Sequence, residues 1–365
     1  MNNAHDAISL DSIRPEVRAR SSYPRFEIDH VQHRLQWNEN PTEFPEKIKQ
    51  EILRRLSDLK WSDYPQFQPY ALMDQIAALN NIGSDQVVIS NGSSSLLRTI
   101  FWATIQTGDA VVVPSPTFLQ YKMLTEVCGG TYHDIPFVEH DAGFALPTDQ
   151  LIDLAQTKQA KLLVICAPAN PTGTVIPAAD IERIAAECGC LLVLDEAYAH
   201  FSRQDLAPLL AKYNNLILVR TMSKAFAMAG VRSAYLLASP ELATEFNKLM
   251  GAFPLDHFST VATQVALENL DYISQSTNDL IAERNRLTEA LDEIPGTKVY
   301  PSGTNFILVR VGDQANALTD KLLQDHSLLI SNMASYPQLA GCVRISVGTR
   351  IQNELVVAEM GKFLE

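Results

Sequence analysis

The sequence is poor in basic residues and has no long apolar stretch. Its 365 residues include 29 Lys and Arg against 42 Asp and Glu, which gives a net charge of −13. This excess of acidic groups argues against nucleic acid or an anionic membrane as the main partner. No stretch reaches the ~18 apolar residues of a membrane span, and the polar N-terminal segment lacks the apolar core of a signal peptide. We therefore expect a cytoplasmic protein that acts on a small molecule.

Cysteine is also scarce, and the five cysteines are scattered along the chain. Three of them, Cys166, Cys188 and Cys190, lie in or beside apolar runs typical of strands. An odd number of scattered thiols argues against a disulfide framework. Cys188-Gly-Cys190 has no second pair with which to hold zinc, so no metal site is predicted.

The length and the apolar content of the chain predict two domains. Hydrophobic residues make up 46% of the sequence, and a single core rarely grows beyond ~250–300 residues. Residues 1–37 carry prolines and mixed charges without a sustained period, so they predict an N-terminal arm. We place a large domain at residues 38–250, and a linking helix with a small C-terminal domain at residues 251–365.

Short apolar runs alternate with helical segments from residue 85 onward, after two helices expected at 45–59 and 70–80. This alternation predicts an α/β fold, in which helices flank a mostly parallel sheet. The expected strands are 86–90, 110–114, 161–166, 191–194, 216–220 and 234–238.

The sequence beyond residue 251 predicts a smaller α+β unit. Long helical stretches come first, and a second alternating region and a last helix follow. The expected helices are 259–270, 279–293 and 352–364, and the expected strands are 298–300, 305–311, 328–331 and 343–347.

Polar residues directly follow five of the apolar runs in the large domain. Ligands of parallel α/β sheets bind beyond the carboxyl ends of the strands, so these residues are expected to converge on one site. The segments are Asn91–Ser94, Pro114–Phe118, Ala167–Gly173, Asp195–Tyr198 and Ser223–Lys224.

The first of these segments has the composition of a phosphate site. Gly92, Ser93 and Ser94 open a predicted helix, whose N-terminus offers free N–H groups and hydroxyls to an anion. Taken alone, an ordinary serine N-cap explains the segment better. Ser223 and Arg232 add a hydroxyl and a guanidinium, and together the five residues describe a pocket for a dianion.

The other segments predict a site for a charged heterocycle. Lys224 follows a buried strand, where poor solvation lowers the pKa of its amine and leaves it free to attack a carbonyl. Asp195 also ends a buried strand, and its carboxylate needs a cation such as a ring N–H⁺. Tyr198 and Asn170 can donate to a phenolic oxygen, and Phe118 offers a ring face. Jointly these groups specify pyridoxal 5′-phosphate bound to lysine.

Short motifs in a fixed order run through nearly the whole chain. They are Trp37-Asn-Glu-Asn-Pro41, Tyr64-Pro65, Asn91-Gly-Ser93, Asn170-Pro-Thr-Gly173, Asp195-Glu-Ala-Tyr198, Arg220-Thr-Met-Ser-Lys-Ala-Phe226, Ala229-Gly-Val-Arg232, Asn305-Phe-Ile-Leu308 and Val343-Arg-Ile-Ser-Val-Gly-Thr349. With these motifs the sequence resembles the fold-type I, class I/II aminotransferases, and it is most similar to the histidinol-phosphate aminotransferases. The resemblance implies a large domain with a mostly parallel seven-stranded sheet, a smaller α+β domain that the N-terminal arm joins, and a homodimer with shared active sites.

The resemblance also implies roles for individual residues. Lys224, Asp195 and Tyr198 would be catalytic: Lys224 would carry the cofactor covalently and Asp195 would pair with its ring nitrogen. The other cofactor-binding residues would be Gly92, Ser93, Ser94, Phe118, Asn170, Ser223, Arg232 and, from the partner subunit, Tyr64. Arg344 would bind the substrate carboxylate as a two-pronged clamp, with Asn40 and Ser331 as further substrate-binding residues.

The sequence departs from the resemblance at the place where the substrate's phosphate would bind. Ser331 stands where the histidinol-phosphate aminotransferases usually carry an arginine, and a serine brings no charge. The Tyr64 loop lacks the basic residue often found before the tyrosine. The arm also carries acidic residues and histidines, so a neutral or cationic substrate side chain is as plausible as a phosphate. These arm residues are Glu27, Asp29, His30 and His33.

Two other classes of function stay open at this point. A lyase or cyclase that eliminates, cyclises or decarboxylates an amino acid would use the same electron sink. A non-catalytic domain that senses the cofactor in a transcription regulator would need a DNA-binding segment. The ~37 residues that precede Asn38 are fewer than such a segment requires, in a strongly acidic protein.

Overall fold

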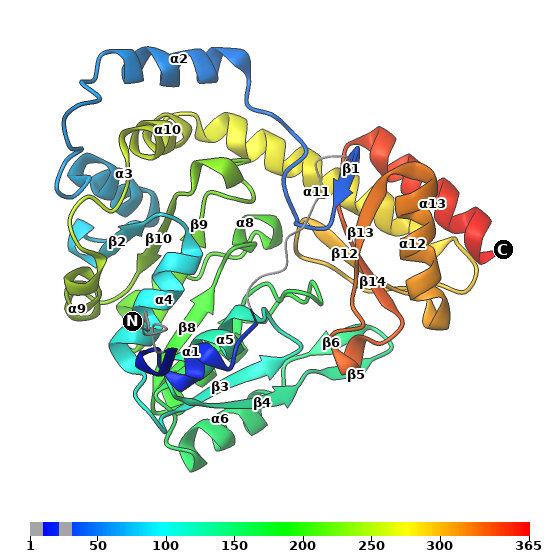
Figure 1. The fold of residues 1–365 in the computed structure, drawn as a ribbon, viewed down its shortest axis with the longest axis horizontal. Coiled ribbons are helices and arrows are strands. Elements are labelled where there is room, and N and C mark those ends of the chain that lie inside the picture. Colours follow the sequence, from blue (N-terminus) through cyan, green and yellow to red (C-terminus); the bar gives the residue numbers. More distant parts are fainter. Residues whose placement is uncertain (1–9, 22–30) are drawn as a thin grey trace, which may run out of the picture.

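A seven-stranded sheet forms the centre of the larger part of the molecule (Figure 1). The computed structural model describes residues 10–21 and 31–365. The strand order is β2-β10-β9-β8-β7-β3-β4, and only β10 runs antiparallel to its neighbours. The strands are β2 (Val87–Ser90), β3 (Ala110–Ser115), β4 (Thr131–Pro136), β7 (Leu162–Cys166), β8 (Leu191–Asp195), β9 (Leu216–Thr221) and β10 (Ala234–Leu237).

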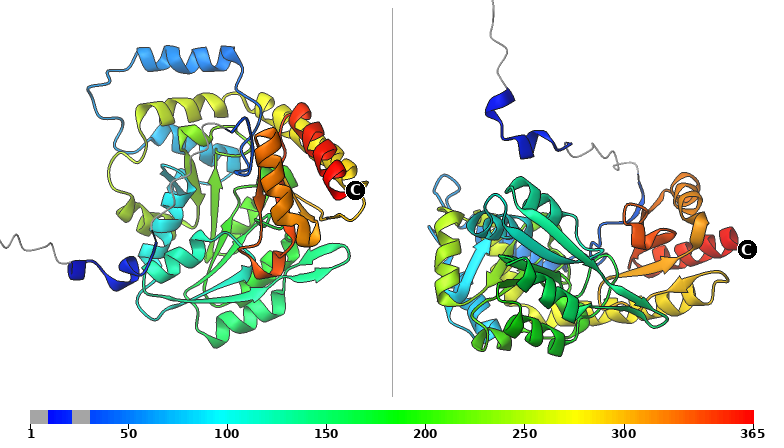
Figure 2. Two further views of the ribbon diagram at one scale, coloured as in Figure 1. Left: turned by 45° about the vertical axis from the view of Figure 1, so that its right-hand side comes forward. Right: turned by 90° about the horizontal axis from the view of Figure 1, so that it is seen from below.

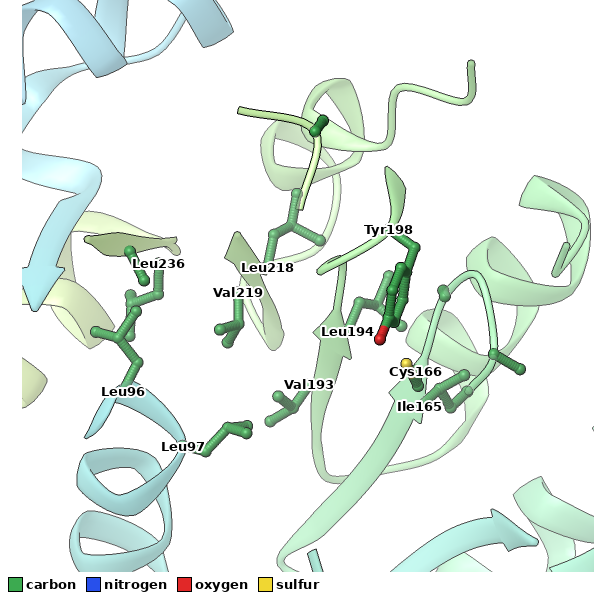
Figure 3. Packing of buried hydrophobic residues seen from close by; sticks show 14 of the residues in the cluster. Leu96, Leu97, Ile165, Cys166, Val193, Leu194, Tyr198, Leu218, Val219 and Leu236 are labelled. Carbon is green, nitrogen blue, oxygen red and sulfur yellow. The ribbon is translucent and has the colours of Figure 1, made fainter. Parts of the chain in front are cut away.

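The central strands are continuous apolar runs because helices cover the sheet. Every residue of β7 and β9 is buried. Figure 3 shows Leu96 and Leu97 from the helix after β2 beside the side chains of Val193, Val219 and Leu236. This packing fixes the carboxyl ends of β7, β8 and β9 side by side, with Cys166 paired to Asp195 in register.

A second sheet has five strands in the order β1-β13-β14-β12-β11. Its first strand comes from the N-terminal segment and pairs in parallel with β13, with His33 opposite Leu328. The other pairs in this sheet are antiparallel. The strands are β1 (His33–Leu35), β11 (Lys298–Val299), β12 (Phe306–Arg310), β13 (Leu328–Asn332) and β14 (Cys342–Ser346).

A separate hairpin, β5 (Val138–His140) and β6 (Gly143–Ala145), extends from the end of β4 toward the second sheet (Figure 1). It follows β4 directly along the chain. The views in Figure 2 show the second sheet and its helices at one end of the molecule and the seven-stranded sheet at the other.

Helices connect and cover the two sheets. Ser239, Asp256 and Thr349 accept backbone N–H bonds at the starts of α9, α10 and α13, which explains why these helices begin there. The helices are α1 (Pro15–Arg18), α2 (Glu46–Ser57), α3 (Tyr70–Asn80), α4 (Ser93–Thr104), α5 (Gln120–Val127), α6 (Thr148–Thr157), α7 (Ala178–Glu187), α8 (Ala199–Ser202), α9 (Pro240–Met250), α10 (His257–Leu267), α11 (Leu270–Asp292), α12 (Ala315–His326) and α13 (Arg350–Leu364). The described residues also contain six short 3₁₀ helices: η1 (Leu10–Ser12), η2 (Ser84–Gln86), η3 (Ala207–Ala211), η4 (Ala229–Val231), η5 (Gly312–Gln314) and η6 (Pro337–Leu339).

The mostly parallel seven-stranded sheet agrees with the expected α/β fold. Three features were not expected. Edge strand β4 alternates between exposed and half-buried residues, so it lacks the apolar run of its neighbours. The exposed strand β5 and the three-residue strand β1 give equally weak signals.

No helix in the described part of the chain is long and apolar enough to cross a membrane.

Candidate active site

A cavity of about 1000 Å³ lies at the carboxyl ends of β8 and β9 and is closed on the other side by β13 and β14. Of the sequence-predicted residues, it brings together Ser93, Ser94, Phe118, Asn170, Asp195, Tyr198, Ser223, Lys224, Arg232, Ser331 and Arg344. The cavity therefore combines residues from both sheets, as expected for a ligand site at strand ends.

Lys224 lies in the loop that follows β9. Its Nζ atom donates to the main-chain carbonyl of Trp37 at 2.7 Å. Burial, assisted by the positive charges of Arg344 and Arg232, lowers the pKa of this amine to about 8. A substantial fraction is therefore uncharged near neutral pH and able to attack a carbonyl carbon.

Asp195 is the last residue of β8 and is 4% exposed. Its Oδ2 atom accepts a hydrogen bond from the Tyr121 hydroxyl at 2.7 Å, and its Oδ1 atom accepts one from the Ala197 N–H at 3.2 Å. Burial raises the pKa of the carboxyl, and these two donors partly oppose that effect. The carboxylate is thus poised to accept a proton donor such as a ring N–H⁺.

An anion site forms where α4 begins. Gly92 caps the helix at φ +88°, and a Cβ atom at this position would collide with the guanidinium of Arg232. Arg232 Nη1 donates to the Ala229 carbonyl at 2.9 Å and to the Ser223 hydroxyl at 3.4 Å. The helix N-terminus, the Ser93 hydroxyl, the Ser223 hydroxyl and the guanidinium together suit a phosphate.

Arg344 in β14 also lines the cavity. Its Nη1 atom donates to Asn170 Oδ1 at 2.6 Å, and its Nη2 atom donates to the Gln36 carbonyl at 2.6 Å and to Ser331 Oγ at 3.3 Å. The guanidinium also lies over the Phe306 ring at 5.1 Å. Its buried Nε atom has no hydrogen-bond partner in the described chain. Since buried donors are nearly always paired, this atom indicates a place for a ligand acceptor.

Tyr198 projects from the segment after β8, and its hydroxyl accepts a hydrogen bond from Asn38 Nδ2 at 2.9 Å. Burial raises the pKa of this phenol, so it stays protonated at neutral pH. Figure 3 shows its ring beside Leu194 and Cys166. Its hydroxyl can therefore donate to an oxygen of a bound ligand.

Three predicted residues, Gly92, Asn40 and Tyr64, are not among those that line the cavity of their own chain. Gly92 lies next to the lining residue Ser93, at the start of α4. The side-chain amide of Asn40 donates to the Ala225 carbonyl at 3.4 Å, and Asn38 lines the cavity in its place. Asn38 lines the cavity and Asn40 does not; the chain turns between them, since Asn38 has a left-handed backbone with φ +55°. Tyr64 is 80% exposed and stacks on Phe253 with 4.6 Å between the ring centroids.

Sequence reasoning missed Tyr121 and Asn38. Tyr121 lies in α5 among buried residues and has no local feature that separates it from a core aromatic residue. Asn38 lies in the motif before Pro41, so its position was a usable signal. The predictions for Glu27, Asp29 and His30 lie outside the described residues, whereas His33 lies in β1.

These groups fit pyridoxal 5′-phosphate. The cradle at Gly92 would accept the phosphate, the buried carboxylate of Asp195 would accept a ring N–H⁺, and Lys224 offers an amine that loses its proton far more readily than an ordinary lysine. Phe118 lies in the cavity wall, and 37% of the residue is exposed. A pyridine ring placed between the Gly92 cradle, Asp195, Lys224 and Phe118 would meet a complementary group at each of these residues.

Comparisons with known proteins agree with this geometry. The model of the family described as aminotransferase class I and II matches residues 31–359. Histidinol-phosphate aminotransferase of Chlorobaculum tepidum is 33% identical over 330 residues, which cover 90% of this chain and 93% of that protein. Histidinol-phosphate aminotransferase 1 of Burkholderia lata is 33% identical over 352 residues, which cover 96% and 97%. The crystal structure of histidinol-phosphate aminotransferase from Sinorhizobium meliloti with pyridoxal 5′-phosphate has a TM-score of 0.88 at 24% identity and covers 98% of each chain.

The chain belongs to the class I and II aminotransferase family, and it has the fold-type I architecture of that family. It is therefore an enzyme that uses pyridoxal 5′-phosphate for amino-group transfer.

The lowered pKa of Lys224 can be tested on cofactor-free protein. An acylating reagent modifies only the uncharged amine, so the modification rate of Lys224 should rise with pH and reach half its maximum near pH 8. Mass spectrometry of the peptide that contains Lys224, after brief labelling between pH 6 and pH 11, measures this midpoint. A midpoint above pH 10 would show that the cavity does not depress the pKa.

Proposed function

We propose that this enzyme transfers the amino group of an α-amino acid, or of a closely related amine, whose side chain carries no negative charge. The observation that carries the proposal is the single cavity in which Lys224, Asp195, Arg232 and Arg344 meet, with Ser331 at its far wall. The curated relatives are named for histidinol phosphate. We transfer from them the type of reaction and not the phosphorylated side chain.

The roles of the residues follow from their positions. Bound pyridoxal 5′-phosphate supplies an electron sink for the bond that is broken at the substrate Cα. The Asp195 carboxylate would hold a proton at the ring nitrogen of the cofactor, and Tyr121 fixes that carboxylate by its hydrogen bond. The Lys224 amine would take up and carry the proton of the substrate Cα. Tyr198 and Asn170 would hold the phenolic oxygen of the cofactor.

Arg344 is proposed to bind the substrate carboxylate. Its unpaired Nε atom and its Nη atoms form a planar edge of the kind that matches two carboxylate oxygens. Burial lowers the pKa of the guanidinium but leaves it charged, because the ordinary value is far above neutrality. An incoming carboxylate would thus give the free Nε atom an ionised acceptor.

The proposal that the substrate side chain carries no negative charge rests on the residues that line the far end of the cavity. Its walls include Leu323, Leu329, Ser331, Met333 and Tyr336. The basic side chains among the described lining residues are Lys224, Arg232 and Arg344. Lys224 and Arg232 are assigned to the cofactor, and Arg344, which contacts Ser331, is assigned to the substrate carboxylate. A phosphate on the side chain would therefore lose its hydration without gaining a cationic partner of its own.

Amino-group transfer is tested by incubating the purified enzyme with a panel of amino acids and a 2-oxo acid acceptor. We expect a new 2-oxo acid and an aminated acceptor in equal amounts, by mass spectrometry, and no turnover with Lys224→Ala. The Lys158→Ala variant, altered at an exposed lysine, should keep wild-type rates. Loss of water or carbon dioxide from the amino acid, with the acceptor unchanged, would identify a lyase or a decarboxylase instead.

The substrate side chain is tested with Ser331→Arg. A guanidinium at this position would give a phosphate a charge-assisted partner, so kcat/KM for histidinol phosphate should rise by at least about tenfold, while kcat/KM for neutral amino acids stays constant or falls. Ser335→Arg, at another serine of the cavity wall, controls for the added charge alone. Efficient turnover of histidinol phosphate by the wild-type enzyme, with neutral amino acids inert, would contradict the proposed side-chain preference.

We also propose a cytoplasmic homodimer in which Tyr64 contributes to the phosphate site of the other subunit. Aromatic residues are exposed from the loop between α2 and α3 to the start of α3, and from the turn after α9 to the start of α10, as expected for a protein interface. These exposed residues are Trp61, Tyr64, Phe67, Tyr70, Phe253 and Phe258.

The shared site predicts complementation between inactive subunits. A mixed dimer of Tyr64→Ala and Lys224→Ala chains should contain one site with both an intact Lys224 and an intact partner tyrosine. Mixing the two variants under subunit exchange should therefore restore activity that neither shows alone. If the mixture stays as inactive as its components while native mass spectrometry detects mixed dimers, Tyr64 does not act across the interface.

A further inference from the structure

Hairpin β5–β6 makes a set of polar contacts with the second sheet that the proposed reaction does not use. Both Glu139 oxygens are engaged. Oε1 accepts from the Tyr300 hydroxyl at 2.6 Å and from Lys298 Nζ at 3.1 Å, and Oε2 accepts from Arg310 Nη2 at 3.0 Å. Burial opposes the charge of Glu139, but these donors outweigh it and lower the pKa of the carboxyl. The carboxylate is thus the centre of a charge-assisted network.

The same network continues to the loop that joins β13 to β14. Arg310 Nε donates to the Tyr300 hydroxyl at 2.8 Å, and Arg310 Nη1 donates to the Ala340 carbonyl at 2.9 Å. Gln338 in this loop also donates to the Ser115 hydroxyl at the end of β3, at 3.2 Å. The loop is therefore held from the hairpin and from the seven-stranded sheet at the same time.

An apolar cluster lies directly beneath these polar contacts. Phe144 of β6 packs against Tyr300 with 4.9 Å between the ring centroids. Tyr300 belongs to a small core that is separate from the main one, and Tyr336 packs against it. The buried members of this core are Tyr300, Leu308, Met333, Leu339 and Cys342.

Met333 and Tyr336 connect this cluster to the active site, because both also line the cavity. The backbone N–H of Tyr336 donates to the Met333 carbonyl at 2.9 Å, and the Met333 N–H donates to the Cys342 carbonyl at 3.0 Å. One face of each residue thus meets the substrate side-chain end of the cavity, and the remainder rests on the cluster that the hairpin covers.

We propose that hairpin β5–β6 is a positioning element for substrate specificity: through Glu139 and Phe144 it fixes residues 333–341, and so sets the shape of the wall that the substrate side chain contacts. The strand β5 itself is exposed along its whole length, so the hairpin has few other contacts that would require this geometry. The identity of the ligand at that wall rests on the proposed function, whereas the mechanical link does not.

Glu139→Ala tests the link, with Glu139→Gln as the conservative variant that keeps an acceptor oxygen. We expect Glu139→Ala to raise KM about tenfold for amino acids with large neutral side chains, with kcat nearly unchanged, because it removes charge-assisted bonds that hold the wall. KM for alanine, whose side chain does not reach the wall, should stay constant. Glu139→Gln should recover part of the loss.

Hydrogen–deuterium exchange of the same variants gives a readout that is independent of turnover. Amides of residues 333–341 should exchange faster in Glu139→Ala, and those of residues 191–198 should not change. Glu187→Ala serves as the matched control, since this carboxylate is similarly exposed and accepts from Arg183 far from the hairpin.

Two results would overturn the proposal. One is unchanged exchange at residues 333–341 in Glu139→Ala. The other is a KM that rises equally for alanine and for large substrates, since the hairpin would then act on the whole site. If the wild-type enzyme transfers no amino group, the proposed function fails, and exchange alone decides whether the hairpin holds the wall.

Discussion

The guanidinium of Arg344 hydrogen-bonds to Asn170 after β7, to the main chain at Gln36 and to Ser331 in β13. These segments belong to both sheets and to the N-terminal part of the chain, so one buried cation ties together three walls of the cavity. A buried cation without good partners would be costly. The requirement to satisfy it therefore fixes the position of Gln36, and with it the neighbouring Trp37 carbonyl that Lys224 contacts.

Residues at the ends of buried strands could be placed from the sequence because the physical signal is local. The apolar runs before Asp195 and Lys224 mark strands that are buried on both faces. Parallel neighbours end at the same edge of a sheet, so a polar residue after each run has to join the others. Edge strand β4 and hairpin strand β5 gave no such signal, because their residues are half-exposed or fully exposed and their pattern resembles that of a loop.

Contacts between distant segments could not be predicted in the same way. The hydroxyl of Tyr121 reaches Asp195 from a helix whose spacing looks like that of ordinary core packing. Whether Asn38 or Asn40 lines the cavity depends on which of them adopts the left-handed backbone conformation. Either asparagine can adopt it, so only the assembled structure decides. The hairpin network around Glu139 joins residues more than 150 positions apart. Each of these features depends on how segments that are distant in the sequence are assembled, about which local pattern carries no information.

The pairing of β1 with β13 has a consequence for how the chain is made. His33 lies opposite Leu328, so β1 is made long before its partner β13. During synthesis the seven-stranded sheet can form as soon as β10 has left the ribosome, whereas β1 has to wait until β13 has been made. Contacts of such long sequence separation form late and slowly. Residues 31–38, which β1 carries to the mouth of the cavity, are therefore expected to settle last, so that the newly made protein becomes a competent enzyme only in its final folding step.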